Sequence, residues 1–363
     1  MSDDRRGRHS EDLKPGTLLE SRPAPTSRDT LSTSDPEPEL VPSMACAADL
    51  RSAALSAAGE ASPRSGPAAE AGDRREVARR RISTLIELLE DPSHTVWAAV
   101  RRELERHGRR ALAQLRRACN HPAPMVRSRA RALLVARGRQ AVLRRLMSFA
   151  SRREICLESG LFLLARLEQP DLDVRPYLMQ FDAFAAEILR RVESRPPTLD
   201  RSLALVTYLG QEIGLSGDSE DYHHPDNIYV HRALERRRGM PLTLAAIYQA
   251  VGRRAGIESA LVPLPGHVML RIRGGGKSAL VDVFKGGEQR TERELLHYLA
   301  EHNLPFQPSF FRDADDASMF QRQVANLKNS YSQRGMWRES RGLASVLAVL
   351  GRRAGGTNSA SDA

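Results

Sequence analysis

The sequence predicts an α+β protein in which helices precede and follow a small antiparallel sheet. Three observations carry this prediction. A helical pattern that opens near a proline occurs twice, at Pro92 and at Pro122. The hydrophobic period changes from helical to alternating after Gly256. Two more amphipathic stretches, residues 317–333 and 337–350, close the chain, and such segregation of helices and strands is typical of the α+β class.

Residues 1–73 are rich in Ala, Ser, Pro, Arg, Glu and Asp and contain almost no aromatic residue. Such a segment cannot bury enough apolar surface to offset its ordering entropy, so we expect it to be disordered. The chain shows no apolar segment after its first charges and no run of about 18 apolar residues, which predicts a cytoplasmic protein without a membrane span.

The cysteines stand singly at positions 46, 119 and 156. Because no two of them form a Cys-x-x-Cys pair, the sequence suggests neither a disulfide framework nor a zinc site. We expect no cofactor.

The first helical region contains an internal repeat. Residues 91–96 recur thirty positions later as residues 121–126, and the offset continues through Gly108 and Gly138. A helix that opens at a Pro and ends at a Gly, repeated once, resembles a short HEAT-type array, and an ordinary helical bundle is the alternative.

The same region is strongly basic, with about 21 Arg against about 7 acidic residues between Asp73 and Arg153. A basic helical face can meet nucleic acid or an acidic partner. The scarcity of aromatic residues for base stacking disfavours nucleic acid.

The central region begins with amphipathic helices, the last of them at 199–213. A helix over 228–237, capped by Asn227 and ended by Gly239, leads to a helix that starts at Pro241.

Strands are expected at 260–262, 267–272 and 279–284, with residues 274–276 as a hairpin turn between the last two. Thr291 is placed to cap a further helix through Leu299, and Gly335 separates the two final helices.

A Gly turn, a helix start, and then strands that carry His267 and Asp282 follow one another in the order found in papain-like and transglutaminase-like cysteine catalysts. In those enzymes the helix N-terminus lowers the pKa of a cysteine thiol. A His serves as base, and an Asp fixes the tautomer of the His.

Three motifs follow one another in this part of the chain: Arg-Arg-Arg-Gly-Met-Pro-Leu-Thr-Leu at 236–244, Pro-Gly-His at 265–267 and Asp-Val-Phe-Lys-Gly-Gly at 282–287. On these motifs the chain resembles the SirB-type family of bacterial transglutaminase-like proteins, and the resemblance covers about residues 154–350. It implies a transglutaminase-like core and a tetratricopeptide-like helical hairpin after it. The family's usual Asp-Pro is replaced by Asp282-Val283.

Composition, the internal repeat and the resemblance together divide the chain into five parts. These are a disordered segment (1–73), HEAT-like helical repeats (74–152), the transglutaminase-like core with its helical lead-in (153–307), a tetratricopeptide-like hairpin (308–352) and a disordered tail (353–363).

The resemblance also assigns roles within the site. His267 takes the general-base position, Asp282 the orienting position, and Pro241 the place of the nucleophile, with Gly266 beside the His as part of a remnant binding site. Proline carries no nucleophile, and losing the nucleophile of a hydrolase triad costs about 10⁶ in rate.

We therefore expect a non-catalytic scaffold or regulator that binds protein partners. One alternative is an enzyme of amide hydrolysis or acyl transfer that uses His267 and Asp282 with a water or with Thr243, whose hydroxyl otherwise satisfies the first turn of its helix. A second alternative is a basic nucleic-acid-associated regulator. The sequence does not identify a small-molecule ligand.

Overall fold

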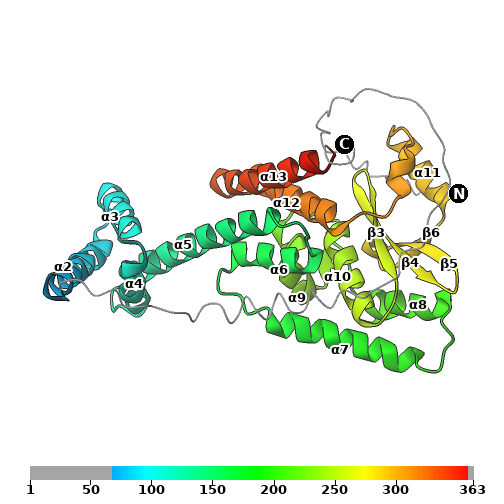
Figure 1. The fold of residues 1–363 in the computed structure, drawn as a ribbon, viewed down its shortest axis with the longest axis horizontal. Helices are drawn as coiled ribbons and strands as arrows, with labels where there is room; N and C mark the ends of the chain where they lie inside the picture. Colours follow the sequence, from blue (N-terminus) through cyan, green and yellow to red (C-terminus); the bar gives the residue numbers. More distant parts are fainter. Residues whose placement is uncertain (1–67, 359–363) are drawn as a thin grey trace, which may run out of the picture. The chain divides into compact units, whose positions relative to one another are not determined.

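The computed structural model describes residues 68–358 (Figure 1). These residues are mostly helical and carry one four-stranded antiparallel sheet, which confirms the predicted α+β class. Most of the segment predicted to be disordered, up to residue 67, lies outside the described residues, whereas residues 68–73 already belong to a helix. Within residues 68–358, no helix combines the length and the apolar character that a bilayer span requires.

The first helices surround a hydrophobic cluster of their own, made by Ile82, Leu89, Leu104, Leu115, Val126 and their neighbours. Ser93 caps α3 by accepting a hydrogen bond from the Val96 amide, and a proline at the first position opens α5. The elements are α2 (Ala68–Glu87), η1 (Leu88–Glu90), α3 (His94–His107), η2 (Gly108–Ala111), α4 (Leu112–Ala118) and α5 (Pro124–Ala150).

The two glycines of the internal repeat play different parts. Gly108 ends α3 with φ of 58°, as expected, whereas Gly138 lies inside α5 and ends nothing. A Cβ at Gly138 would lie 2.5 Å from the Pro170 side chain, so this glycine permits a close approach of a neighbouring loop. The second unit is therefore one long helix and not a copy of the first.

A larger cluster joins the second half of α5 to the rest of the described chain. Its centre is α10 (Pro241–Arg254), whose residues are buried from Pro241 to Gly252. A helix that is buried on all sides must lie in a core, and α6 (Leu157–Glu168), α7 (Arg175–Val192) and α8 (Leu199–Val206) pack around it. The predicted helix over 199–213 changes after Val206 into a π-helical turn, η3 (Thr207–Glu212).

The sheet has the strand order β3–β4–β5–β6, with every neighbouring pair antiparallel. Gly275 and Gly276 have φ of 58° and 72°, as a two-residue hairpin turn requires, so the predicted hairpin is confirmed. The predicted third strand ends at Asp282, because Phe284 belongs to the 3₁₀ turn η5 (Val283–Lys285). The strands are β3 (Ser259–Leu264), β4 (His267–Gly274), β5 (Lys277–Asp282) and β6 (Glu288–Arg290).

Each face of the sheet meets its own set of helices. Leu270, Ile272 and Val281 belong to the large cluster around α10. Residues of the opposite face pack with Leu295 of α11 (Glu292–Glu301), which is capped by a reciprocal Thr291–Glu294 box. The side chains of this second face are Val262, Leu264, Met269 and Leu280.

The segment before α10 differs from the expectation of one helix over 228–237. Tyr229 is the N-cap of a shorter helix, α9 (Val230–Arg236), and Arg237 ends it in the left-handed conformation at φ of 57°. Arg238 and Gly239 form β2, which pairs in parallel with β1 (Ser216–Gly217). Asn227, at the end of the turn η4 (Pro225–Asn227), accepts the Met240 amide with its carbonyl oxygen and so supports the start of α10.

The chain ends in the expected helical pair, α12 (Asp316–Gln333) and α13 (Trp337–Asn358), which pack against each other and turn at Gly335 (Figure 1). A short turn, η6 (Pro308–Phe311), precedes them. Helix α13 continues to Asn358, so the part of the predicted disordered tail at 353–358 is helical, and residues 359–363 lie outside the described residues.

Candidate functional site

A histidine and an aspartate form the centre of the candidate site. His267 is the first residue of β4 and Asp282 the last of β5, and the neighbouring strands bring His267 Nε2 to 2.9 Å from Asp282 Oδ1. The Asp282 side chain is 8% exposed and that of His267 is 18% exposed, so a ligand can reach only the histidine. The two residues that the sequence placed as base and orienting acid are thus in hydrogen-bond contact.

Asp282 is fixed by more than the histidine. Its Oδ1 also accepts the amides of Phe284 and Lys285, at 3.1 and 3.3 Å, as the N-cap of η5. Burial acts to raise the pKa of Asp282, but the hydrogen bond and the charge of His267 and the Lys285 amide outweigh it, and the pKa lies below its ordinary value. The carboxylate therefore stays ionised and holds one side of the imidazole.

Side chains from three other elements hold the turn between β3 and β4. Every main-chain carbonyl from Leu264 to His267 accepts a side-chain hydrogen bond. Tyr222 donates to Gly266 at 3.4 Å, Tyr298 to Pro265 at 3.1 Å, and Arg322 to both Leu264 and His267 at 2.8 and 2.9 Å. We call the three donor side chains, Tyr222, Tyr298 and Arg322, the turn clamp.

Gly266 makes the turn possible. Its φ is +74°, a conformation that L side chains rarely adopt, and a Cβ there would lie 3.3 Å from the Tyr298 hydroxyl. The turn clamp and Gly266 together fix the position from which the His267 side chain projects, which is the preorganisation that functional sites need.

Arg322 brings a positive charge to the turn without a carboxylate partner among the described residues. Burial lowers the pKa of its guanidinium, and the neighbouring Tyr222 and Tyr298 oppose this shift. Burial also raises the pKa of both phenols. The main-chain carbonyls of Leu264 and His267 compensate for part of the desolvation of the guanidinium.

The start of α10 provides no nucleophile. Pro241 is buried at the first helical position, where the sequence resemblance placed the missing cysteine. Two residues later Thr243 is fully buried. Its hydroxyl donates to the Ile228 carbonyl at 3.4 Å and accepts from Gln323 at 2.8 Å. Those two contacts occupy the hydroxyl, and no described contact joins it to His267.

An aromatic ring connects the segment before α10 to the histidine. Gly217 pairs with Gly239 in the β1–β2 ladder, and a Cβ on Gly217 would lie 2.4 Å from the Phe284 ring. That ring meets the His267 ring edge-on at 6.0 Å between centroids and the Tyr222 ring at 5.8 Å. The structure thus places the approach to α10 and the His267–Asp282 pair around one aromatic side chain.

Tyr222, Tyr298 and Arg322 were not predicted as site residues. Tyr222 precedes the His223-His224 pair in a loop that reads as a simple turn, and the other two lie on helices whose sequence shows only amphipathic spacing. No local signal could have found them, because each acts by reaching a distant carbonyl.

A second His–carboxylate pair was also not predicted from the sequence. His231 is fully buried with Nε2 2.9 Å from Glu168 Oε2. Arg232 adds a two-pronged contact to the same carboxylate. Burial acts to raise the pKa of Glu168, but His231 and Arg232 lower it to about 2. This pair joins α6 to α9 inside the core and serves the fold.

No group of three metal-binding side chains gathers anywhere in residues 75–353. His224 accepts the Asp226 amide and caps η4, as a turn residue does.

Comparison with known proteins places this site in a family context. Residues 175–325 match the family model described as "Transglutaminase-like superfamily". A UPF0162 protein of Xylella fastidiosa (strain 9a5c) is 34% identical over 146 residues, 40% of this chain and 52% of that protein. F-box only protein 21 of Mus musculus is 25% identical over 166 residues, 44% of this chain and 26% of that protein.

The similarity is therefore partial on both sides, since the chain spans about half the length of the UPF0162 relative and a quarter of the mouse protein. No solved structure matches the chain. The matched region holds the His267–Asp282 pair, the start of α10 and the whole turn clamp. Residues 175–325 of the chain are thus similar to the transglutaminase-like superfamily.

Proposed function

We propose that this chain is a non-catalytic transglutaminase-like protein that binds a protein partner through the surface around His267. One observation carries the proposal: the helix start that would bear the nucleophile holds a buried proline, while the histidine–aspartate pair is intact and the histidine is partly exposed. An imidazole that is held in position, even without a nucleophile beside it, can still donate a hydrogen bond to a polar group of a partner or accept one from it.

The finer assignment belongs to the same proposal. The motifs at 236–244, 265–267 and 282–287 support a SirB-type protein. The separate hydrophobic cluster of the first helices supports a HEAT-like unit within 74–152, and the packed pair α12–α13 supports a tetratricopeptide-like hairpin at 308–352. Paired helices of both kinds present extended surfaces that suit protein binding. We place the protein in the bacterial cytoplasm.

A second candidate function is hydrolysis or acyl transfer with His267 as a general base for water. The turn clamp favours it, because a base must be held in place and the carbonyls from Leu264 to His267 are all occupied by side-chain donors. Thr243 is a poorer nucleophile than water here, since its hydroxyl is buried and already bonded twice.

A third candidate, nucleic-acid binding, is favoured by the basic helical region. Several exposed arginines of this region form no ion pair within the described residues, so they are available to phosphates. They are Arg102, Arg109, Arg110, Arg116, Arg117, Arg144 and Arg145.

Partner capture from the lysate of the source organism, run beside a turnover screen on peptide amides, separates the first two candidates. The wild type and His267→Ala are compared, with circular dichroism to show that both are folded. Capture of one stoichiometric partner that weakens in His267→Ala, without turnover by either protein, supports the binding function. Turnover that the wild type shows and folded His267→Ala lacks would contradict it and support the enzyme.

A further inference from the structure

The outer edge of β5 is only partly covered. Strand β4 pairs with β5 from Lys277 onward, but β6 reaches only Leu280, Val281 and Asp282. At Arg290 the chain leaves the sheet for α11, so residues 277–279 have no strand on their outer side among the described residues. Ser278 is exposed and Ala279 half-buried. Hydrogen-bonded pairs alternate along an antiparallel ladder, so within residues 277–279 the N–H and C=O of Ser278 point away from β4 and offer one donor and one acceptor to an added strand.

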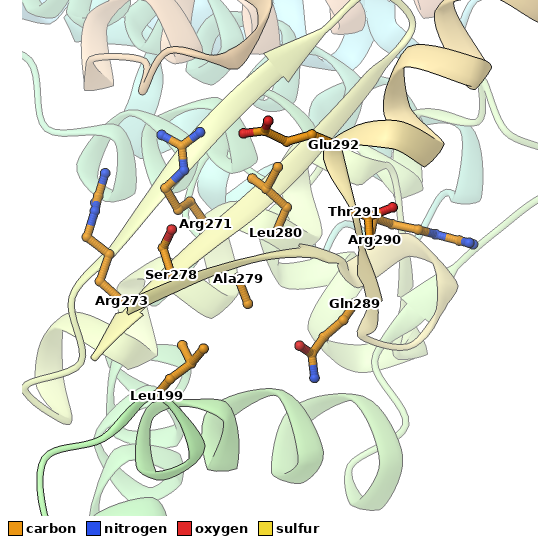
Figure 2. A pocket seen from close by; sticks show the side chains of 10 residues that line it. All are labelled: Leu199, Arg271, Arg273, Ser278, Ala279, Leu280, Gln289, Arg290, Thr291 and Glu292. Atoms are coloured by element: carbon orange, nitrogen blue, oxygen red, sulfur yellow. The ribbon is translucent and has the colours of Figure 1, made fainter. Parts of the chain in front are cut away.

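A cavity of about 550 Å³ opens on this edge. Figure 2 shows it between Leu199 of α8 and Glu292 at the start of α11, with Arg271 and Arg273 of β4 on a third side. The volume lies within the range of ligand sites, which is roughly 300–1,000 Å³. Its lining is Leu199, Arg271, Arg273, Ser278, Ala279, Leu280, Gln289, Arg290, Thr291 and Glu292.

The register of the sheet determines which way the side chains of an added strand would point. Opposite residues of an antiparallel pair share a face. Arg273 pairs with Ser278, so an added residue opposite Ser278 would lie on the same face as Arg273, two strand spacings or about 9.6 Å away, which the long arginine side chain can span. Ile272 pairs with Ala279 and belongs to the large hydrophobic cluster, against which Leu199 packs. An added residue opposite Ala279 would therefore face Leu199.

The charges of the cavity favour an acidic residue at the first of these positions. Three arginines and one glutamate line it. Each of these arginines already has an ion-pair partner. Asp313 pairs with both Arg271 and Arg273, Glu258 pairs with Arg273, and Glu288 and Glu294 pair with Arg290, but these carboxylates are 35%, 58%, 56% and 51% exposed. Exposed ion pairs contribute little, so a carboxylate brought into the cavity can replace Glu258 on Arg273 at small cost.

We propose that the open edge of β5 binds an extended segment of a partner protein as an added strand, with an acidic side chain opposite Ser278 and an apolar side chain opposite Ala279. The main-chain pairing gives affinity, and the Arg273 and Leu199 contacts give sequence preference. The site goes beyond the proposed function, because Arg271 lies four residues along β4 from His267, about 13 Å at the rise of a strand. Binding at this edge does not use the histidine.

A library of short random peptides, selected against the full chain, tests the inference. We expect enrichment of peptides with Asp or Glu next to a small apolar residue. An enriched peptide should shift the amide resonances of residues 277–279. Arg273→Glu should weaken it about tenfold or more and should favour the same peptide with Lys at the acidic position. The matched control, His267→Ala, should bind as the wild type does.

Thermal melting checks that Arg273→Glu is folded, and Arg273→Gln, which removes the charge but keeps an uncharged polar side chain, replaces it if it is not. Four results would overturn the inference. These are no enriched peptide, enrichment without acidic residues, affinity unchanged in both Arg273 variants, or resonance shifts away from β5. Free glutarate that competes as well as the peptide would also overturn it, since the cavity would then be a site for small anions.

Discussion

Replacing Pro241 by cysteine tests whether the start of α10 still has the arrangement of a cysteine catalyst. The new thiol would stand at the first position of a 14-residue helix, where the N-terminal dipole favours an anion. The cysteine would add a main-chain N–H that proline lacks, but an N–H at the first position of a helix has no acceptor within the helix in any case. The substitution should therefore cost only about 0.4–1 kcal/mol of stability, from the added freedom of the unfolded chain.

The expected effect on the thiol can be worked through. An ordinary cysteine has a pKa of about 8.5, and helix starts beside a histidine bring it to about 7 or below. At pH 6 this raises the thiolate fraction about thirtyfold. The lower basicity of the thiolate reduces its reactivity about fivefold, at a Brønsted slope of about 0.45. Alkylation at position 241 should thus be about sixfold faster at pH 6 than that of an unperturbed cysteine.

The assay is the pH dependence of iodoacetamide labelling at position 241, followed by peptide mass spectrometry so that Cys46, Cys119 and Cys156 do not interfere. The midpoint is compared between Pro241→Cys and the double variant Pro241→Cys/His267→Ala. We expect a midpoint near pH 7 that rises in the double variant. A midpoint at about 8.5 in both proteins would refute the expectation, drawn from the sequence resemblance, that position 241 lies within reach of His267.

Four further outcomes are expected. Thr243→Val should lower the free energy of unfolding by about 1–3 kcal/mol in urea titrations, because buried Gln323 loses an acceptor, while Thr243→Ser should stay close to wild type. If Thr243 were a nucleophile, Thr243→Val would instead lose an enzymatic activity that Thr243→Ser keeps, while both variants would be as stable as the wild type. Tyr298→Phe removes one bond of the turn clamp and should cost about 0.5–1.5 kcal/mol; equal stability would show that the bond to Pro265 contributes nothing. Glu168 has a pKa of about 2 against an ordinary 4.5, so its contribution to stability is complete above pH 4.5 and is lost as the pH falls through 2. This contribution is up to about 3 kcal/mol, and in urea unfolding Glu168→Gln should flatten the pH dependence over that window. Nucleic-acid binding by the basic helices should weaken steeply with salt and fall further in Arg116→Gln/Arg117→Gln, and a flat salt dependence would exclude that function.

Local chemistry determined a good part of this fold. Pro241 opens α10, the Gly275-Gly276 pair closes the hairpin, and Thr291 caps α11, each as the residue type predicts. These features depend on neighbours within a few positions, so the sequence contains all the information that they need. His267 and Asp282 were found in the same way, through motifs on adjacent strands.

Other local predictions failed where a distant contact decided the conformation. Gly138 was expected to end a helix, but it lies inside α5, where its lack of a Cβ leaves room for the Pro170 side chain. Gly239 was expected to end the helix before α10, yet it pairs with Gly217 in the β1–β2 ladder, and Arg237 takes the left-handed position instead. Packing and pairing between remote segments outweigh the local preference of a single residue.

Contacts between remote segments also decide the surroundings of the candidate histidine. Tyr222, Tyr298 and Arg322 come from a loop and two helices and meet only at the carbonyls of the turn before β4. The sequence by itself determined which residues begin and end most elements and which pair could carry chemistry. Only the tertiary structure decided how that pair is held and where the sheet edge is left open. Hydrogen bonds between remote segments produce no periodic pattern in the sequence from which they could be predicted.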